Sequence, residues 1–295
     1  PSVSSSLTLF TIGMLLTASV SGVSDILMNT RIAEIEAERG RPLMNLNHAI
    51  YSFSFAGSAV LTGLAREAGG SPIQVAGVVC AGVLAACLFM VAPHRHVAGE
   101  DSILPRSTGR VLVLLAGLVF MVSFMSEQAV EGWSALHLER TLDGRPAEGA
   151  LGPAILGVTM GIGRLMGQSV AARVRDTVMI GLACLIAAFG VALAAMAPAL
   201  AVAYAGFAVM GLGISVVVPL SMGLVGRVVP QTERVAAIGR ASVIGYGAFL
   251  VGPSLMGLTS DAFGLRVAFL MISVLLVLVA AVLVPVIARR VRGTV

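Results

Sequence analysis

Nine long apolar stretches constrain this chain more than any other feature of its sequence. Each has about the 20 residues that an α-helix needs to cross a bilayer, and short polar gaps separate them. A helix satisfies its own backbone in hydrocarbon, and the alternation of a membrane barrel strand is absent. The sequence therefore predicts an all-α, polytopic membrane helix bundle. Its expected transmembrane helices are roughly 7–28, 45–65, 72–92, 110–132, 149–170, 176–197, 199–223, 236–258 and 265–288.

Composition supports a lipid environment and argues against other partners. The 295 residues are 57% apolar and 12% charged, with a mean hydropathy of +0.97, whereas a soluble domain needs a charged exterior. All 19 basic residues are arginine, and they are spread over short gaps rather than clustered on a polar domain, so no nucleic-acid partner is expected. The cysteines Cys80, Cys87 and Cys184 lie inside apolar stretches without metal-site spacing. We expect no metal and no other cofactor.

Arginine placement predicts the orientation of the chain. Fourteen arginines fall in the odd-numbered gaps and the C-terminal tail, four fall in the even-numbered gaps, and Arg164 lies inside the fifth stretch. Cytoplasmic loops are rich in arginine, so the N-terminus is expected outside and the C-terminus in the cytoplasm. The longest polar interval, 93–109, is expected to be a cytoplasmic loop between two bundles. It separates three spans in 1–92 from six spans in 110–295.

Four ionisable residues inside apolar stretches are candidates for a transport pathway. A charge within a span costs at least ~2.5 kcal/mol, so such groups mark functional positions by default. A spacing of four places Asp25 with Asn29 on one helix face, and Glu127 with Glu131 on another. Structural roles are the alternatives. Asp25 and Asn29 would then cap a helix end, Glu131 would lie at the outer interface, and Arg164 would extend to the interface.

Further polar and aromatic residues accompany these groups. His48 and Ser52 lie one turn apart at the start of the second stretch, where they serve either the pathway or a structural hydrogen bond. Trp133 and Tyr246 are possible solute contacts, or else an interfacial ring and a packing residue. His137 is expected at the outer interface.

Several segments resemble transporters of the major facilitator superfamily, in particular a bacterial group of sugar-transporter-like inner-membrane proteins. The resemblance to the family's fourth and fifth helices rests on Gly22-Val23-Ser24-Asp25-Ile26-Leu27-Met28-Asn29, Glu36, Gly40-Arg41-Pro42-Leu43-Met44 and His48-Ala49-x-x-Ser52. Three later segments fit the same group: Glu127 to Leu138 with Trp133-Ser134-Ala135-Leu136, Gly163-Arg164-Leu165-Met166-Gly167 running into Arg173, and Gly245-Tyr246-Gly247 through Gly252-Pro253 to Gly264-Leu265-Arg266.

The resemblance implies an incomplete version of the family fold. The family has twelve helices in two bundles of six, and this chain aligns from the fourth helix onward, which gives three helices plus six. Residues 1–92 would then be a partial N-terminal bundle. The family's cytoplasmic signature resembles G-x-x-x-x-D-R-x-G, but here Gly167 is followed by Ala172 and Arg173, and Arg175 replaces the last glycine. Arg164 and Arg173 are the expected residues of the cytoplasmic gate.

The predicted function is secondary active transport of a small organic solute, coupled to protons, by alternating access across a bacterial inner membrane. Glu127 and Asp25 are the predicted cavity or coupling residues. A truncated, non-transporting membrane bundle is the first alternative. An intramembrane enzyme is the second alternative. No HExxH, Walker or GxSxG motif occurs in the sequence. Gly252-Pro253-Ser254 is only weakly similar to the motif of an intramembrane serine protease. The residues expected to assist the solute and proton pathway are Asn29, His48, Ser52, Glu131, Trp133 and Tyr246.

Overall fold

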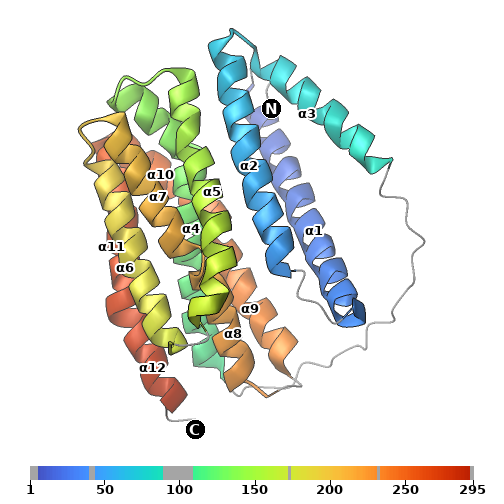
Figure 1. The fold of residues 1–295 in the computed structure, drawn as a ribbon, viewed down its shortest axis with the longest axis vertical. Helices are drawn as coiled ribbons and strands as arrows, with labels where there is room; N and C mark the ends of the chain where they lie inside the picture. Colours follow the sequence, from blue (N-terminus) through green and yellow to red (C-terminus); the bar gives the residue numbers. More distant parts are fainter. Residues whose placement is uncertain (1–5, 40–43, 89–108, 172–173, 231–232, 293–295) are drawn as a thin grey trace. The chain divides into compact units, whose positions relative to one another are not determined.

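A computed structural model describes residues 6–39, 44–88, 109–171, 174–230 and 233–292 (Figure 1). Within these ranges the chain is almost entirely helical, and no β-strand occurs. Seven of the described helical segments are long and apolar enough to cross a membrane. The predicted all-α polytopic membrane bundle is thereby confirmed, and the chain is an integral membrane protein.

All nine predicted stretches contain helix, but three of them are interrupted. The seventh predicted stretch is α7 followed by α8, the eighth is α9 followed by α10, and the ninth contains a short π-helical turn, η2. The elements are α1 (Leu7–Arg39), α2 (Met44–Glu67), α3 (Pro72–Cys87), α4 (Arg110–Thr141), α5 (Pro146–Ala171), α6 (Asp176–Ala195), α7 (Leu200–Ile214), α8 (Val217–Val228), α9 (Arg234–Tyr246), α10 (Ala248–Phe263), α11 (Leu265–Leu278), η2 (Val279–Leu283) and α12 (Val284–Arg292).

Two of the predicted spans are absent from the seven apolar helices. Helix α2 has 24 residues, but Asn45, Asn47 and His48 in its first two turns lower its hydropathy. Helix α3 has 16 residues, fewer than a perpendicular span needs, and its predicted last residues lie outside the described part of the chain. Composition therefore indicates seven spans in the described residues, with α2 and α3 as helices of lower apolar content or shorter length.

The chain divides into two compact units. Unit 1 comprises Pro1–His48 and Leu64–Ser102, and unit 2 comprises Ala49–Gly63 and Ile103–Val295. Most of α2 thus belongs to the same unit as α4 to α12. The division into 1–92 and 110–295 stays a prediction, and residues 93–108 of the predicted loop lie outside the described residues.

In unit 1, the start of α3 illustrates how local sequence fixes a helix end. The Ser71 hydroxyl accepts a hydrogen bond from the Gln74 backbone N–H at 3.3 Å, and the Ser71 N–H donates to Gln74 Oε1 at 2.8 Å. This reciprocal capping box, with Pro72 at the first helical position, satisfies backbone groups that would otherwise lack partners. Gly69 precedes it with a φ of +84°, a conformation that glycine adopts without steric cost.

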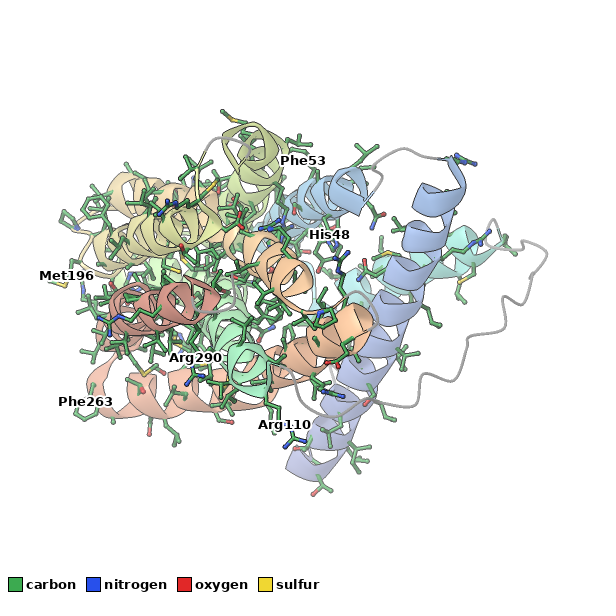
Figure 2. The ribbon with its side chains drawn as sticks, turned by 90° about the horizontal axis from the view of Figure 1, so that it is seen from below. His48, Phe53, Arg110, Met196, Phe263 and Arg290 are labelled. Carbon is green, nitrogen blue, oxygen red and sulfur yellow. The ribbon has the colours of Figure 1, made fainter. Side chains whose placement is uncertain are left out.

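In unit 2, α4 lies at the centre and contacts α5, α8, α9, α10 and α11. Its buried face includes Val119, Phe120, Val130 and Leu138, all of which have no exposed surface. Large side chains on the rim of unit 2 instead point away from the bundle, as Figure 2 shows for Met196 and Phe263. Because so many apolar side chains are exposed, this surface suits a lipid environment.

Helices α6 and α7 pack with their backbones in contact. A Cβ added at Gly190 would lie 2.6 Å from the Gly206 carbonyl oxygen, and one at Gly213 would lie 2.6 Å from the Ala187 backbone nitrogen. Any side chain at these two positions, even the methyl group of alanine, would force the two backbones apart. Small residues therefore set the distance between these helices, as is typical of helix pairs in membranes.

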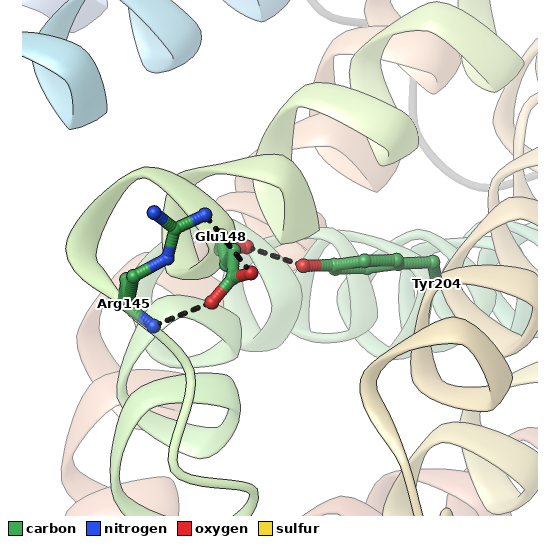
Figure 3. Close-up of polar contacts among 3 residues, drawn as sticks. All are labelled: Arg145, Glu148 and Tyr204. Atoms are coloured by element: carbon green, nitrogen blue, oxygen red, sulfur yellow. Dashed lines mark hydrogen bonds and ion pairs between the residues drawn. The ribbon is translucent and has the colours of Figure 1, made fainter.

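A polar contact joins the start of α5 to α7 (Figure 3). Glu148, in the first turn of α5, accepts hydrogen bonds from the Arg145 backbone N–H at 2.8 Å and from Arg145 Nη2 at 3.3 Å. The Tyr204 hydroxyl of α7 donates to the Glu148 carbonyl oxygen at 2.9 Å. An acidic side chain at a helix N-terminus also interacts favourably with the helix dipole, so this contact stabilises the beginning of α5.

The expectation that His137 lies at the outer interface is wrong. His137 is fully buried in unit 2, its Nε2–H donates to the Ala194 carbonyl oxygen at 3.1 Å, and its ring centroid lies 5.2 Å from that of Phe269. Arg266 donates to the neighbouring Ala195 carbonyl at 3.2 Å. The last carbonyls of a helix have no partner within it, so α4 and α11 together satisfy the end of α6.

Candidate functional site

The candidate site is centred on the middle of α4, where two carboxylates lie inside an apolar helix. Glu127 and Glu131 are both partly buried and interact electrostatically with Arg164 of α5. Glu127 also interacts electrostatically with Glu131, as their spacing of one turn requires. Three charged groups from two helices therefore share one region of unit 2, and both helices are among the membrane-length segments.

Arg164 connects these carboxylates to a third helix. Its Nη1 donates a hydrogen bond to Ser52 Oγ of α2 at 2.6 Å, although the two residues are 112 positions apart in the sequence. Ser52 is only 3% exposed, so the bond is shielded from solvent. A charge-assisted hydrogen bond in such surroundings is stronger than a neutral one. Arg164 thus interacts with the carboxylates of α4 and also binds the hydroxyl of α2.

Glycines of α5 allow α2 to approach closely enough for this bond. A Cβ added at Gly157 would lie 2.8 Å from the Ser52 carbonyl oxygen, and one at Gly161 would lie 3.0 Å from the Phe53 ring. At the other end of the contact, a Cβ at Gly63 would lie 3.3 Å from the Pro146 carbonyl oxygen. The two helices are therefore antiparallel and in contact over most of the described length of α2 within unit 2.

An apolar groove of about 640 Å³ lies beside this contact, lined by side chains such as Phe53, Val60 and Ile155. Its one polar lining residue is Thr159, whose hydroxyl donates to the Ile155 carbonyl at 2.8 Å within its own helix. The groove offers no free polar group to a hydrophilic solute. The charged groups around Glu127 are therefore the better candidates for binding one.

An aromatic cluster that includes Phe124 of α4 was not expected from the sequence. The Phe124 ring stacks on Tyr246 with centroids 5.6 Å apart and on Phe249 at 5.8 Å, and Tyr246 and Phe249 are 6.0 Å apart. Phe124 precedes Glu127 by three residues, so both lie on one side of α4. Of these rings, the sequence analysis identified only Tyr246. The spacing of three residues between Phe124 and Glu127 could have predicted that both lie on one side of α4. Nothing in the sequence predicts that the Phe124 ring contacts Phe249.

The remaining predicted residues lie elsewhere or are not described. Trp133 packs against α10, its ring 3.6 Å from the position of a Cβ on Gly257. It is two residues from Glu131 and hence on the opposite side of α4. Asn29 of α1 and His48 of α2 belong to unit 1, and Asn29 Oδ1 is buried without a hydrogen-bond partner in the described structure. Asp25 belongs to α1, but its side chain lies outside what the structure describes, as does Arg173 entirely.

The chain is similar in sequence to known membrane proteins. Residues 116–294 match the sequence model of the Major Facilitator Superfamily. An uncharacterized transporter (y4wD) of Sinorhizobium fredii is 29% identical over 297 residues, covering 95% of this chain and 75% of that protein. An uncharacterized MFS-type transporter of Yersinia pestis is 27% identical, with 92% and 70% covered. The membrane protein MosC of Rhizobium meliloti is also 27% identical, with 92% and 66% covered. The family match spans most of unit 2 and includes Glu127, Glu131 and Arg164.

Proposed function

Because this chain belongs to the major facilitator superfamily of membrane transporters, we propose that it is a secondary active transporter that moves a small organic solute by alternating access, coupled to protons. The single observation that carries the proposal is the group formed by Glu127, Glu131 and Arg164 in the middle of the bundle. Ionisable residues are costly inside a membrane span and are therefore kept where ions or substrates pass.

The carboxylates are the groups that can bind and release a proton in this arrangement. Glu127 has Glu131 as a like-charged neighbour on its own helix and Arg164 as an opposite charge on the facing one. Proton binding or solute binding at Glu127 changes how strongly Arg164 is attracted toward α4. We propose that Glu127 is the coupling residue, that Glu131 assists it, and that Tyr246 contacts the solute.

The Arg164–Ser52 hydrogen bond is the contact that we propose to change during alternating access. It joins α5 to α2, and by the family resemblance these helices belong to different halves of the transporter. When Arg164 is drawn toward ionised carboxylates, its bond to Ser52 weakens, and when Glu127 is neutralised, the bond is favoured. Arg173 is proposed to belong to the same gate, and Asp25, Asn29 and His48 are proposed as residues of the solute and proton pathway on the basis of the family resemblance. Trp133 is proposed only as a more distant solute contact.

We propose the orientation from the charge distribution of the chain. Fourteen of the 19 arginines lie in the gaps assigned to one side of the membrane, which supports a cytoplasmic C-terminus. The named relatives come from bacteria, which supports the cytoplasmic membrane of a bacterium as the location. The membrane-spanning fold and the transporter relatives favour a transporter over an enzyme.

The test is solute-dependent proton movement in proteoliposomes that contain the chain and a trapped pH-sensitive dye. A panel of labelled sugars, polyols, amino acids and amines is added, and we expect at least one of them to be taken up together with a pH change inside. Glu127→Gln should abolish the pH change, and Asp25→Asn should reduce it. The matched control is Asp261→Asn, which removes the same charge from an exposed position near the end of α10.

Two results would contradict parts of the proposal. If both Glu127→Gln and Asp25→Asn leave uptake and its pH dependence unchanged, the assignment of coupling residues is wrong. If no solute of the panel moves in the presence of correctly inserted protein, the chain is better described as a non-transporting membrane bundle. Ser52→Ala and Arg164→Lys test the gate separately, since they should alter the rate of uptake while leaving solute binding in place.

A further inference from the structure

The aromatic cluster formed by Phe124, Tyr246 and Phe249 adds a property to the site that transport alone does not require. Tyr246 is 38% exposed and Phe249 is 48% exposed, whereas Phe120, one turn before Phe124, has no exposed surface. The cluster is therefore not simply part of the packed core. Tyr246 and Phe249 lie partly at the surface of unit 2.

Local structure explains why the three rings meet. A Cβ added at Gly245 would lie 2.6 Å from Phe120 Cβ and 3.1 Å from the Phe124 ring, so glycine at this position lets α9 approach α4. The chain passes from α9 to α10 at Gly247, and Tyr246 and Phe249 lie on either side of this junction. Both rings stack on Phe124 across this junction.

The cluster also lies at the depth of the charged groups. Phe124, Glu127 and Glu131 all fall near the middle of the 32-residue helix α4. Tyr246 and Phe249 fall near the middle of the apolar segment Ala236–Phe263. Three residues of helix rise by about 4.5 Å, so the backbone positions of Phe124 and Glu127 are separated along α4 by less than the length of one small organic molecule.

The interacting charged groups that the structure describes here carry opposite signs in unequal number. Two carboxylates, Glu127 and Glu131, and one guanidinium, Arg164, leave one negative charge when all three are ionised. An uncompensated charge is costly in low-dielectric surroundings, so a bound cation would stabilise the site. Aromatic faces attract cations through their quadrupole and also stack on apolar groups. A carboxylate pair beside exposed aromatic rings thus has the chemistry that recognises an organic cation.

We propose that Phe124, Tyr246 and Phe249, together with Glu127 and Glu131, bind a monovalent organic cation that carries an aromatic or bulky apolar group. This inference rests on the proposed transport function, because it names the chemical class of the solute. In this proposal, Phe124 and Phe249 select for the aromatic or apolar group of the solute. The carboxylates of Glu127 and Glu131 select for its positive charge.

The test is equilibrium binding of radiolabelled tetraphenylphosphonium to the purified chain in lipid nanodiscs, with empty nanodiscs subtracted. Tetraphenylborate is the matched probe, since it has nearly the same size and shape but carries a negative charge. We expect saturable binding of the phosphonium and none of the borate. Glu127→Gln should weaken phosphonium binding at least tenfold. Phe249→Leu, which keeps an apolar side chain but removes the ring, should weaken it about 3- to 30-fold.

The control is Phe263→Leu, the same substitution at the end of α10, where the ring is 72% exposed and outside the cluster. It should leave binding unchanged within twofold. Equal binding of phosphonium and borate, or an equal loss from Phe249→Leu and Phe263→Leu, would overturn the inference.

Transport measurements separate this inference from the proposed function. If the phosphonium binds as expected but no solute crosses the membrane of proteoliposomes, the cation site stands and the transport proposal fails. If an uncharged solute is transported and the phosphonium does not compete with it, transport stands and the assignment of an organic cation is wrong.

Discussion

Replacing Gly190 by alanine tests whether backbone contact between α6 and α7 holds unit 2 together. The added Cβ would lie 2.3 Å from the Met210 backbone nitrogen and 2.6 Å from the Gly206 carbonyl oxygen, and both are backbone atoms that cannot rotate away. Ordinary van der Waals contact begins near 3.4 Å, so relieving the 2.3 Å contact requires the helices to separate by roughly 1.1 Å.

The size of the effect follows from two opposing terms. Inserting a methyl group into a packed interface typically costs about 1–3 kcal/mol. Alanine is favoured over glycine in a helix by up to about 1 kcal/mol, which offsets part of this cost. We therefore expect Gly190→Ala to reduce the free energy of unfolding by about 1–2 kcal/mol.

The control is Gly132→Ala in α4, where an added Cβ would meet no atom within 4 Å. Gly132→Ala gains stability from the higher helix propensity of alanine and suffers no steric clash. The difference in unfolding free energy between the two variants therefore measures the cost of the clash at Gly190. Unfolding in mixed micelles of increasing SDS fraction can be followed by maleimide labelling of Cys184, which is buried in α6, after Cys80 and Cys87 are replaced by serine. Equal unfolding midpoints for Gly190→Ala and Gly132→Ala would refute the reasoning.

Three further substitutions test individual contacts by the same unfolding measurement. His137→Ala removes a fully buried ring and its bond to the end of α6, and should cost about 2–4 kcal/mol, whereas a loss below 1 kcal/mol would contradict its burial. Tyr204→Phe removes the donor to the Glu148 carbonyl and should cost about 1 kcal/mol, and an unchanged midpoint would show that the bond contributes nothing. Asp176→Asn breaks the ion pair with Arg227 between α6 and α8. This pair is partly exposed, so the loss should stay below about 1 kcal/mol, and a larger loss would show a stronger role.

Much of the fold was predictable because the bilayer imposes a local requirement. Hydrocarbon provides no hydrogen-bond partners, so each apolar stretch long enough to span must be a helix. This is why all nine predicted stretches contain helix, including those that are interrupted near Gly247 and at η2. The same local rule placed Glu127 and Glu131 on one face, because their spacing of four residues is a property of the helix itself.

Tertiary structure decided which helix faces meet, and the sequence could not supply this. In a soluble protein the apolar side of a helix faces the core, whereas a membrane helix is apolar on both its core side and its lipid side. Hydropathy therefore gave no reason to expect His137 in the interior, or Phe249 beside Phe124. The bond from Arg164 to Ser52 depends on the close approach of α2 and α5 at Gly157. Such an approach arises from the packing of whole helices, and no local periodicity encodes it.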